Sequence, residues 1–438
     1  MYTLYRYRVE LYSWSRSRAH TPSVRARPED WRRTMPILST AELSFPFETD
    51  SPFLFAVYHH DKYPPGNEKM GIDKALLSGH RMGADFGHPS GWNMYHGEMV
   101  PGFPKHPHRG FETITVTRKG VIDHTDSLGH GGRFGFGDTQ WMTAGAGVVH
   151  SEMFPLLDRK NANENEFFQI WINLPRRTKF AEPSFKMLWA EDLSAKVFAD
   201  SATGASAEVQ LVAGTLPGFA QPPSPPPDSY ASEARSDVLI VSVRLSAKAA
   251  WTLPAYEGEG GTAGLHRNVY FYSGSALTID GRRFEGGKRV KVEPGAPLQL
   301  VATAAGPAQV LVLQGRDIGE PVVQHGPFVG ETQQDIQRAF SDYRRTQFGG
   351  WPWESDSVAF PREKQRFAQC VGGTFTRGCP CGRSRWAFPA QHLPNTAGTP
   401  TGGSRSGRSR RSPTGPLLCA ETAVSEEQRD EALETVYG

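Results

Sequence analysis

The sequence predicts an all-β protein, because its patterned part consists of short strand-like runs broken by turn residues. Between Phe45 and Trp189, short apolar runs are separated by Gly, Pro, Asn and Asp, which is typical of a β-sandwich or barrel. A second set of short, evenly spaced runs occupies residues 238–313. The 438 residues suffice for two such domains. We therefore expect two β-barrels in tandem.

The clearest strand of the first set follows residue 110. Glu112, Ile114 and Val116 alternate with threonines, as the residues of a half-buried strand do. They share the parity of His106 and His108, so we expect these histidines to face inward together with them. Residues 167–174 are apolar on nearly both faces, which predicts a strand between two layers.

A Pro- and Ser-rich segment, residues 218–236, precedes the second set and predicts a surface loop. Within that set, Asp280-Gly281 predicts a hairpin turn. After it, Thr332 and Asp335 form a capping-box pattern ahead of apolar residues at helical spacing, which predicts an amphipathic helix. This helix should end at Gly349-Gly350, with the following tryptophans packed onto the body.

The two ends of the chain lack such patterning. Residues 1–35 are rich in Arg, Ser and Tyr, which fits an organelle transit peptide, or a disordered leader ahead of a start at Met35. The Ser-Arg repeats predict a disordered tail. The predicted divisions are a leader at 1–35, a first domain at 36–195, a second at 196–330, the helix within 331–353, and the tail at 354–438.

Charge and cysteine usage exclude several classes of protein. The formal net charge of +2 gives no field that argues for direct nucleic-acid binding. No apolar run approaches the roughly 18 residues of a membrane span, so we expect no membrane partner. We also expect a monomer. All four cysteines lie in the predicted tail, which fits a reducing compartment. Cys379 and Cys381 have no second pair at zinc-finger spacing, so a zinc site there is not favoured.

Two pairs of potential metal ligands stand out, His106 with His108 and His150 with Glu152. Residues two apart on a strand face the same way, so two neighbouring strands could direct these side chains to one point in a barrel. Imidazole and carboxylate suit Fe(II), Mn, Ni, Cu or Zn. The spacing predicts a divalent-metal site, and the competing interpretation is a satisfied polar core. The other histidines of the first domain, considered singly, are interpreted as surface or turn residues; they are His59, His60, His80, His88, His96, His124 and His130.

Four segments resemble the pirins, a family of the cupin superfamily: residues 102–113, 138–153, 169–175 and 320–329. The resemblance implies two stacked cupin barrels and one mononuclear Fe(II) in the first, held by His106, His108, His150 and Glu152. It implies a metal-free second barrel, and His266 is indeed the one histidine between Glu208 and Gln324. The general cupin pattern would instead place the acidic ligand at Glu112. Because pirins use the later glutamate, we expect Glu152 as ligand and Glu112 beside it, orienting a histidine.

Two departures from the pirin pattern are evident. Phe136 stands where pirins usually have proline, which would loosen one turn without removing a ligand. Residues 59–100 form an extended insertion rich in Gly and His, which could serve as a lid over the metal.

The resemblance implies a quercetin 2,3-dioxygenase activity, in which a flavonol binds iron, Glu152 accepts its proton as the catalytic base, and dioxygen opens the ring. One alternative is a redox-dependent transcriptional co-regulator that binds a nuclear transcription factor without turnover. Another is a structural or storage-like metal site with no reaction. All of these hypotheses require the same ligands. We expect a cytoplasmic or nuclear location, or an organelle if the leader acts as a targeting signal.

Overall fold

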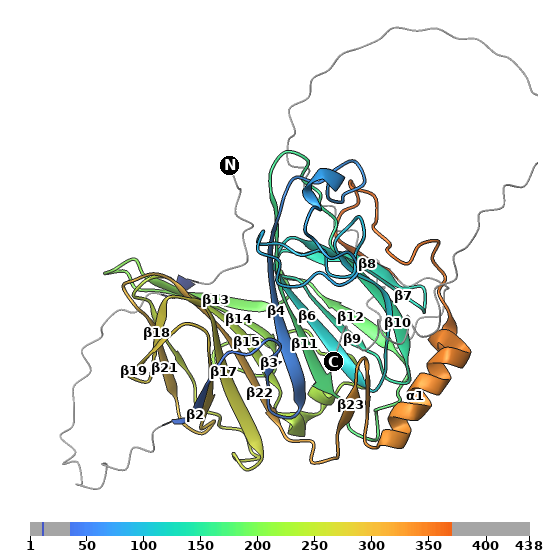
Figure 1. Cartoon of the computed structure of the whole chain (residues 1–438). Helices are drawn as coiled ribbons and strands as arrows, with labels where there is room; N and C mark the ends of the chain where they lie inside the picture. The colour runs from blue at the N-terminus through green and yellow to red at the C-terminus, as the bar shows by residue number, and fades with distance from the viewer. Residues whose placement is uncertain (1–10, 13–35, 370–438) are drawn as a thin grey trace, which may run out of the picture.

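The computed structural model describes residues 11–12 and 36–369. Four main β-sheets form two barrels that lie side by side (Figure 1), as the sequence predicts. The predicted leader, apart from residues 11–12, and the cysteine-containing part of the tail lie outside the described residues. Within the part that the structure describes, no helix is long and apolar enough to cross a membrane.

The first barrel consists of a six-stranded and a five-stranded sheet. The six-stranded sheet has the order β12 (Ser184–Leu188), β9 (Thr139–Thr143), β6 (Phe111–Lys119), β11 (Asn163–Asn173), β4 (Phe53–Tyr63) and β3 (Phe47–Glu48). The five-stranded sheet has the order β25 (Phe367–Gln369), β8 (Gly131–Gly135), β7 (Val121–Asp126), β10 (Val148–Met153) and β5 (Gly102–His108). A 3-10 turn, η1 (Lys74–Leu76), lies in the long segment between β4 and β5.

The second barrel consists of an eight-stranded and a four-stranded sheet. The larger has the order β1 (Leu11–Tyr12), β13 (Ser194–Ala199), β14 (Ser206–Ala213), β15 (Leu239–Leu245), β22 (Ala308–Arg316), β17 (Leu265–Gly274), β20 (Lys288–Val292) and β2 (Ile37–Glu42). The smaller has the order β16 (Ala250–Leu253), β21 (Leu298–Ala302), β18 (Ala276–Ile279) and β19 (Arg282–Glu285). Asp280-Gly281 connects β18 to β19, as predicted.

Three apolar cores separate the four sheets. One lies inside each barrel, and a third lies between the six-stranded and eight-stranded sheets, which pack face to face. β11 contributes to two of these cores, because Phe167 faces the first barrel's interior and Phe168 faces the other barrel. This confirms the prediction of a strand between layers. Each fully buried aromatic or aliphatic side chain contributes about 1.5–3 kcal/mol, so the inter-barrel core fixes the two barrels relative to each other.

The predicted parity of the histidines and the following strand was wrong. β5 and β6 belong to different sheets, and Gly110, with φ +88, turns the chain between them. On β6, Ile114 and Val116 face the inter-barrel core, whereas Thr115 faces the interior of the first barrel. The turn reverses the parity, so alternation cannot be carried from His108 to Glu112.

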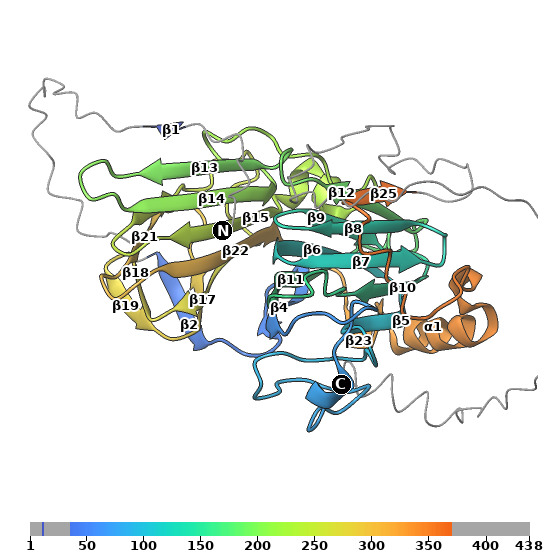
Figure 2. The same ribbon diagram turned by 90° about the horizontal axis from the view of Figure 1, so that it is seen from above.

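The C-terminal helix α1 (Gln333–Thr346) begins with the predicted capping box of Thr332 and Asp335. It ends earlier than predicted, because Gln347 takes the left-handed conformation and a 3-10 turn, η4 (Gln347–Gly349), follows. A short hairpin of β23 (Val323–His325) and β24 (Phe328–Gly330) precedes the helix. The helix lies on the side of the first barrel away from the second (Figures 1 and 2), and the hairpin packs against the helix through Phe328.

The prediction of a tail without structure from residue 354 was wrong for residues 354–369. Residues 351–369, here called the C-terminal strap, cross the first barrel and end in β25, which pairs with β8. The buried guanidinium of Arg133 is paired with Asp123 and donates hydrogen bonds to the strap carbonyls of Phe360, Pro361 and Lys364. Trp353 packs as expected, with its indole N–H donating to the carbonyl of Asp126 at 2.8 Å.

The loop predicted at the surface, residues 218–236, is partly buried between the barrels. It contains two 3-10 turns, η2 (Tyr230–Ser232) and η3 (Ala234–Ser236). Ser229 and Tyr230 are buried, and the Ser229 hydroxyl donates to Glu112 at 2.6 Å. This loop therefore connects the second barrel to a buried carboxyl of the first.

Candidate metal centre

β5 and β10 are antiparallel neighbours, and their register places the predicted histidines together. His106 lies opposite His150, and His108 lies opposite Val148. The ring centroids of the three histidines are 4.4–4.8 Å apart, and one ring nitrogen from each lies within 4.8 Å of the others. Strands in this register therefore form the three-histidine cluster that the two sequence pairs predict.

Glu152 lies beside this cluster. A register irregularity between His150 and Glu152 re-aims the strand, and Glu152 Oε2 is 3.9 Å from His150 Nε2. Thr115 Oγ1 lies 3.1 Å from Glu152 Oε1, and the Gln169 amide donates to Oε2 at 2.9 Å. The single Thr115 hydroxyl proton lies between two acceptors, and the shorter contact is to Gln169 Oε1 at 2.5 Å. Thr115 therefore orients the amide that holds the carboxylate. Its role as a metal ligand stays a prediction.

The donor set fits a divalent transition metal. His150 is fully buried, and neither of its ring nitrogens is hydrogen bonded by a described residue. An orphaned buried imidazole is costly unless it binds something. The His106 Nδ1–H donates to the Pro104 carbonyl at 2.8 Å, which leaves Nε2 as the ligand atom. Three imidazoles and an adjacent carboxylate are ligands that such a metal accepts.

Burial keeps these imidazoles neutral, as metal binding requires. It lowers the pKa of His106 to about 4 and the pKa values of His108 and His150 well below the usual value. Neighbouring histidines lower the pKa of His150 further, because their charges would repel. Burial raises the pKa of Glu152, while its hydrogen bonds and His124 oppose that rise.

The expectation that Glu112 orients a ligand histidine was wrong. Its carboxyl accepts hydrogen bonds from Thr143 at 2.6 Å and from Ser229 at 2.6 Å, and neither bond reaches a histidine. Burial raises its pKa to about 7. The reversed parity of β6 explains this position. Glu112 lies on the same face of the strand as Ile114 and Val116, and that face points toward the second barrel.

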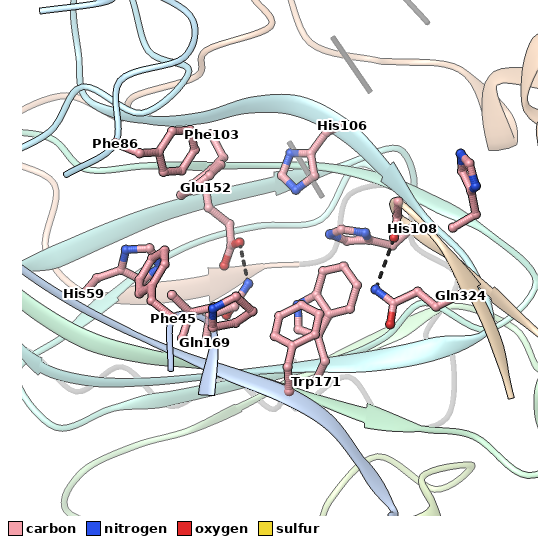
Figure 3. A pocket seen from close by; sticks show the side chains of 15 residues that line it. Phe45, His59, Phe86, Phe103, His106, His108, Glu152, Gln169, Trp171 and Gln324 are labelled. Atoms are coloured by element: carbon pink, nitrogen blue, oxygen red, sulfur yellow. Dashed lines mark hydrogen bonds between the residues drawn. The ribbon is translucent and has the colours of Figure 1, made fainter. Parts of the chain in front are cut away.

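The histidine cluster opens into a cavity of about 800 Å³ (Figure 3). Its walls are mostly aromatic. Strands β4, β5, β10 and β11 of the first barrel contribute, together with residues 45–46, the inserted segment before β5 and the hairpin β23–β24. The lining residues are Phe45, Pro46, Phe55, Val57, His59, Phe86, Phe103, His106, His108, Glu152, Gln169, Trp171, Gln324, His325 and Gly326. Phe86 is the inserted segment's contribution, so that segment forms part of a wall. A cavity of this size suits a small multi-ring molecule.

Several histidines that we interpreted as surface residues are buried instead. His59 lines the cavity, and His124 and His130 both contact Asp126 Oδ2, at 3.5 and 3.0 Å. A signal for His59 was present in the sequence, because it directly follows the apolar run of residues 53–58 and lies two and four residues after Val57 and Phe55, which also line the cavity.

A second cluster of potential ligands, His60, Glu164 and Glu166, does not resemble a metal site. Lys119 lies 2.8 Å from Glu164 and 3.3 Å from Glu166, so a cation already occupies the position a metal would need. His60 is bonded to Glu164 at 2.7 Å.

Comparisons with known proteins agree with the fold. The Pirin family model matches residues 51–172, and the Pirin C-terminal cupin domain matches residues 240–349. A Pirin-like protein of Caulobacter vibrioides is 35% identical over 262 residues, 57% of this chain and 82% of that protein. Pirin-1 of Arabidopsis thaliana is 32% identical, covering 57% of this chain and 79% of that protein. A Pseudomonas aeruginosa relative, 33% identical over 56% of this chain and 80% of its own length, carries the provisional name quercetin 2,3-dioxygenase.

Among solved structures, a quercetin 2,3-dioxygenase from Acinetobacter baumannii aligns with a TM-score of 0.54 at 24% identity. The alignment covers 72% of this chain and 98% of that chain, and it supports the bicupin fold. With the family models on both barrels and relatives matched over about four fifths of their length, the chain belongs to the pirin family of cupin proteins.

Proposed function

We propose that this pirin is an iron-dependent dioxygenase that opens the central ring of flavonols. The observation that carries the proposal is the buried three-histidine cluster with Glu152 beside it, at the end of a cavity with aromatic walls. Such a site combines open metal positions with room for a planar multi-ring substrate. A relative that bears the provisional name quercetin 2,3-dioxygenase supports the same substrate class.

The bound iron supplies the redox chemistry that lets dioxygen react with the ring. The chain's own residues do the rest. Glu152 accepts the proton of the flavonol 3-hydroxyl, and burial favours this because it raises the carboxyl's pKa. Gln169 and Thr115 hold the carboxylate toward the cavity. Trp171 and Phe55, whose ring centroids are 4.3 Å apart, form an apolar wall that excludes water. Flavonol and one dioxygen give a depside and carbon monoxide.

The test uses the full chain loaded with Fe(II) under nitrogen and then given quercetin and oxygen. We expect loss of flavonol absorbance, matched oxygen uptake and release of carbon monoxide. His150→Ala should abolish all three signals by removing a ligand. Glu112→Gln is the matched control, because that buried carboxyl lies outside the centre, and it should retain turnover. Turnover no faster than with the same concentration of free Fe(II) would overturn the proposal.

The alternative role as a redox-dependent nuclear co-regulator, and the expected cellular location, stay predictions. An equal affinity of the ferrous and ferric forms for a nuclear partner would exclude redox switching.

A further inference from the structure

A second polar group faces the cavity away from the histidine cluster. His59 is 6% exposed, and its ring lines the cavity while stacking on Phe167 at 4.5 Å. Its Nδ1 lies 2.8 Å from the Tyr95 hydroxyl, and that hydroxyl donates to Asp61 Oδ2 at 2.8 Å. Its other nitrogen, Nε2, makes no hydrogen bond with any described residue. A buried imidazole nitrogen beside a cavity is an unused binding group.

The chain of hydrogen bonds determines which nitrogen of His59 carries the proton. Asp61 is fully buried and accepts two further hydrogen bonds from Asn93, at 2.9 and 2.8 Å. Because an ionised carboxylate only accepts, the single Tyr95 proton goes to Asp61. The Tyr95 oxygen must then accept from His59 Nδ1–H, so Nε2 carries the lone pair. Burial lowers the pKa of His59 to about 3, which keeps the ring neutral. His59 is thus prepared to accept a hydrogen bond.

The register of β4 and β11 gives the position of His59 relative to the centre. Trp171 pairs with Phe55, Gln169 with Val57, and Phe167 with His59. The rings of Trp171 and His108 have centroids 5.0 Å apart, and Gln169 donates to Glu152. The next pair along the two strands, Phe167 with His59, therefore lies beyond the carboxylate. From Phe55 to His59, β4 advances about 13 Å. Figure 3 shows His59 and His108 toward opposite ends of the pocket, with Glu152 and Gln169 between them.

We propose that His59 is a second binding point for the substrate, accepting a hydrogen bond from a phenolic hydroxyl on the part of the molecule that extends away from the histidine cluster. The proposal rests on the proposed function, because it presumes an aromatic substrate anchored at the centre. Tyr95 and Asp61 are positioning residues that fix the tautomer. The site therefore selects polyhydroxylated ring systems over their unsubstituted parents.

The arrangement is more than ordinary packing, because a hydroxyl, a buried carboxylate and an unusual backbone conformation all serve to orient His59. Tyr95 has φ +55, a left-handed conformation that is strained for an aromatic residue. This conformation lies in the inserted segment, and Tyr95 forms two backbone hydrogen bonds with Asp85 there. A histidine needed only for packing beside Phe167 would require neither the hydroxyl nor the carboxylate behind it.

The test measures binding rather than turnover, using calorimetry on the Fe(II)-loaded full chain under nitrogen. The probes are 3-hydroxyflavone and two analogues, one with extra hydroxyls on the fused ring and one with an extra hydroxyl on the phenyl ring. In the wild type, we expect at least one analogue to bind about tenfold more tightly than the parent, the value of one well-formed hydrogen bond. His59→Leu should remove this preference while leaving the parent's affinity within about twofold.

Two further variants separate binding from packing. His59→Gln keeps an acceptor and should retain part of the preference. Tyr95→Phe keeps the ring but frees the tautomer, so the preference should fall without loss of the parent ligand. An unchanged preference in His59→Leu, or no preference in the wild type, overturns the inference even if turnover is present. A preference that His59→Leu abolishes supports it even if no flavonol is consumed, and no binding by any flavonol overturns both proposals.

Discussion

Glu112 allows a quantitative test, because it is a buried carboxyl outside the candidate metal centre. Its oxygens accept hydrogen bonds from Thr143 and Ser229, and burial raises its pKa to about 7. We predict that Glu112→Gln stabilises the protein above pH 7. Glutamine has nearly the same shape, and both contacts can persist because each hydroxyl can donate or accept.

The sign of this effect follows from proton binding. The unfolded chain releases the Glu112 proton near pH 4.5, whereas the folded chain keeps it up to about pH 7. Between these values the folded state binds more protons, so the wild type's free energy of unfolding falls as the pH rises. The difference between 4.5 and 7 is about 2.5, and each pKa unit is worth about 1.36 kcal/mol. The wild type therefore loses roughly 3 kcal/mol, and the variant does not.

Urea denaturation followed by tryptophan fluorescence measures the difference, with metal removed by a chelator from both proteins. At pH 5 the folded wild type carries a neutral carboxyl, so the variant should be equal to it or about 1 kcal/mol less stable, the value of one neutral hydrogen bond. At pH 8 it should be more stable by roughly 2 kcal/mol. Titration of the histidines affects both proteins equally and cancels. The same difference at pH 5 and pH 8 would refute the reasoning.

Three other predictions concern the centre and the strap. Gln169→Leu removes the amide that holds Glu152, so metal affinity measured by competition with a chelator should fall about 10–100-fold; an unchanged affinity would show that the amide is not needed. Arg133→Met leaves Asp123 buried without its partner and should cost about 3–5 kcal/mol in urea denaturation, with faster proteolysis of the C-terminal strap. A strap as resistant as in the wild type would contradict this. In metal-free protein, stability should fall as the pH drops from 6.5 to 4, because the folded pKa of His106 is about 4 and the unfolded chain takes up its proton first; His106→Phe should flatten that slope.

The histidine cluster could be predicted from the sequence because the information is local. His106 and His108 are two residues apart on one strand, and His150 lies on a second, so a single antiparallel pairing brings them together. The direction of Glu112 could not be predicted in the same way. A glycine turn at Gly110 joins two different sheets, and the parity of side chains does not continue through such a turn.

His59 and the strap were missed for different reasons. A single histidine after an apolar run signals burial, but only the fold brings the Tyr95 hydroxyl to His59 Nδ1 and Asp61 to that hydroxyl. The strap has little apolar periodicity, because much of its attachment is polar. Its carbonyls accept from Arg133, and its own Arg362 donates to the carbonyls of Leu156 and Asn67. Backbone acceptors of this kind leave no pattern in the side-chain sequence.

Each end of the described chain packs on the barrel that is more distant from it in the sequence. β2 precedes the first barrel yet pairs with β20 of the second, and the hairpin β23–β24, α1 and the strap follow the second barrel yet pack on the first. During synthesis, the pocket wall and the outer sheet edge of the first barrel therefore cannot be complete until residues 323–369 have been made. Dividing the chain between Glu191 and Asp192, in the turn between β12 and β13, should yield two halves that each lack a strand or a wall, and that regain the cavity only when mixed. Folding of the half that contains the histidine cluster thus depends on contacts between residues far apart in sequence, which predicts slow assembly for a protein of this size.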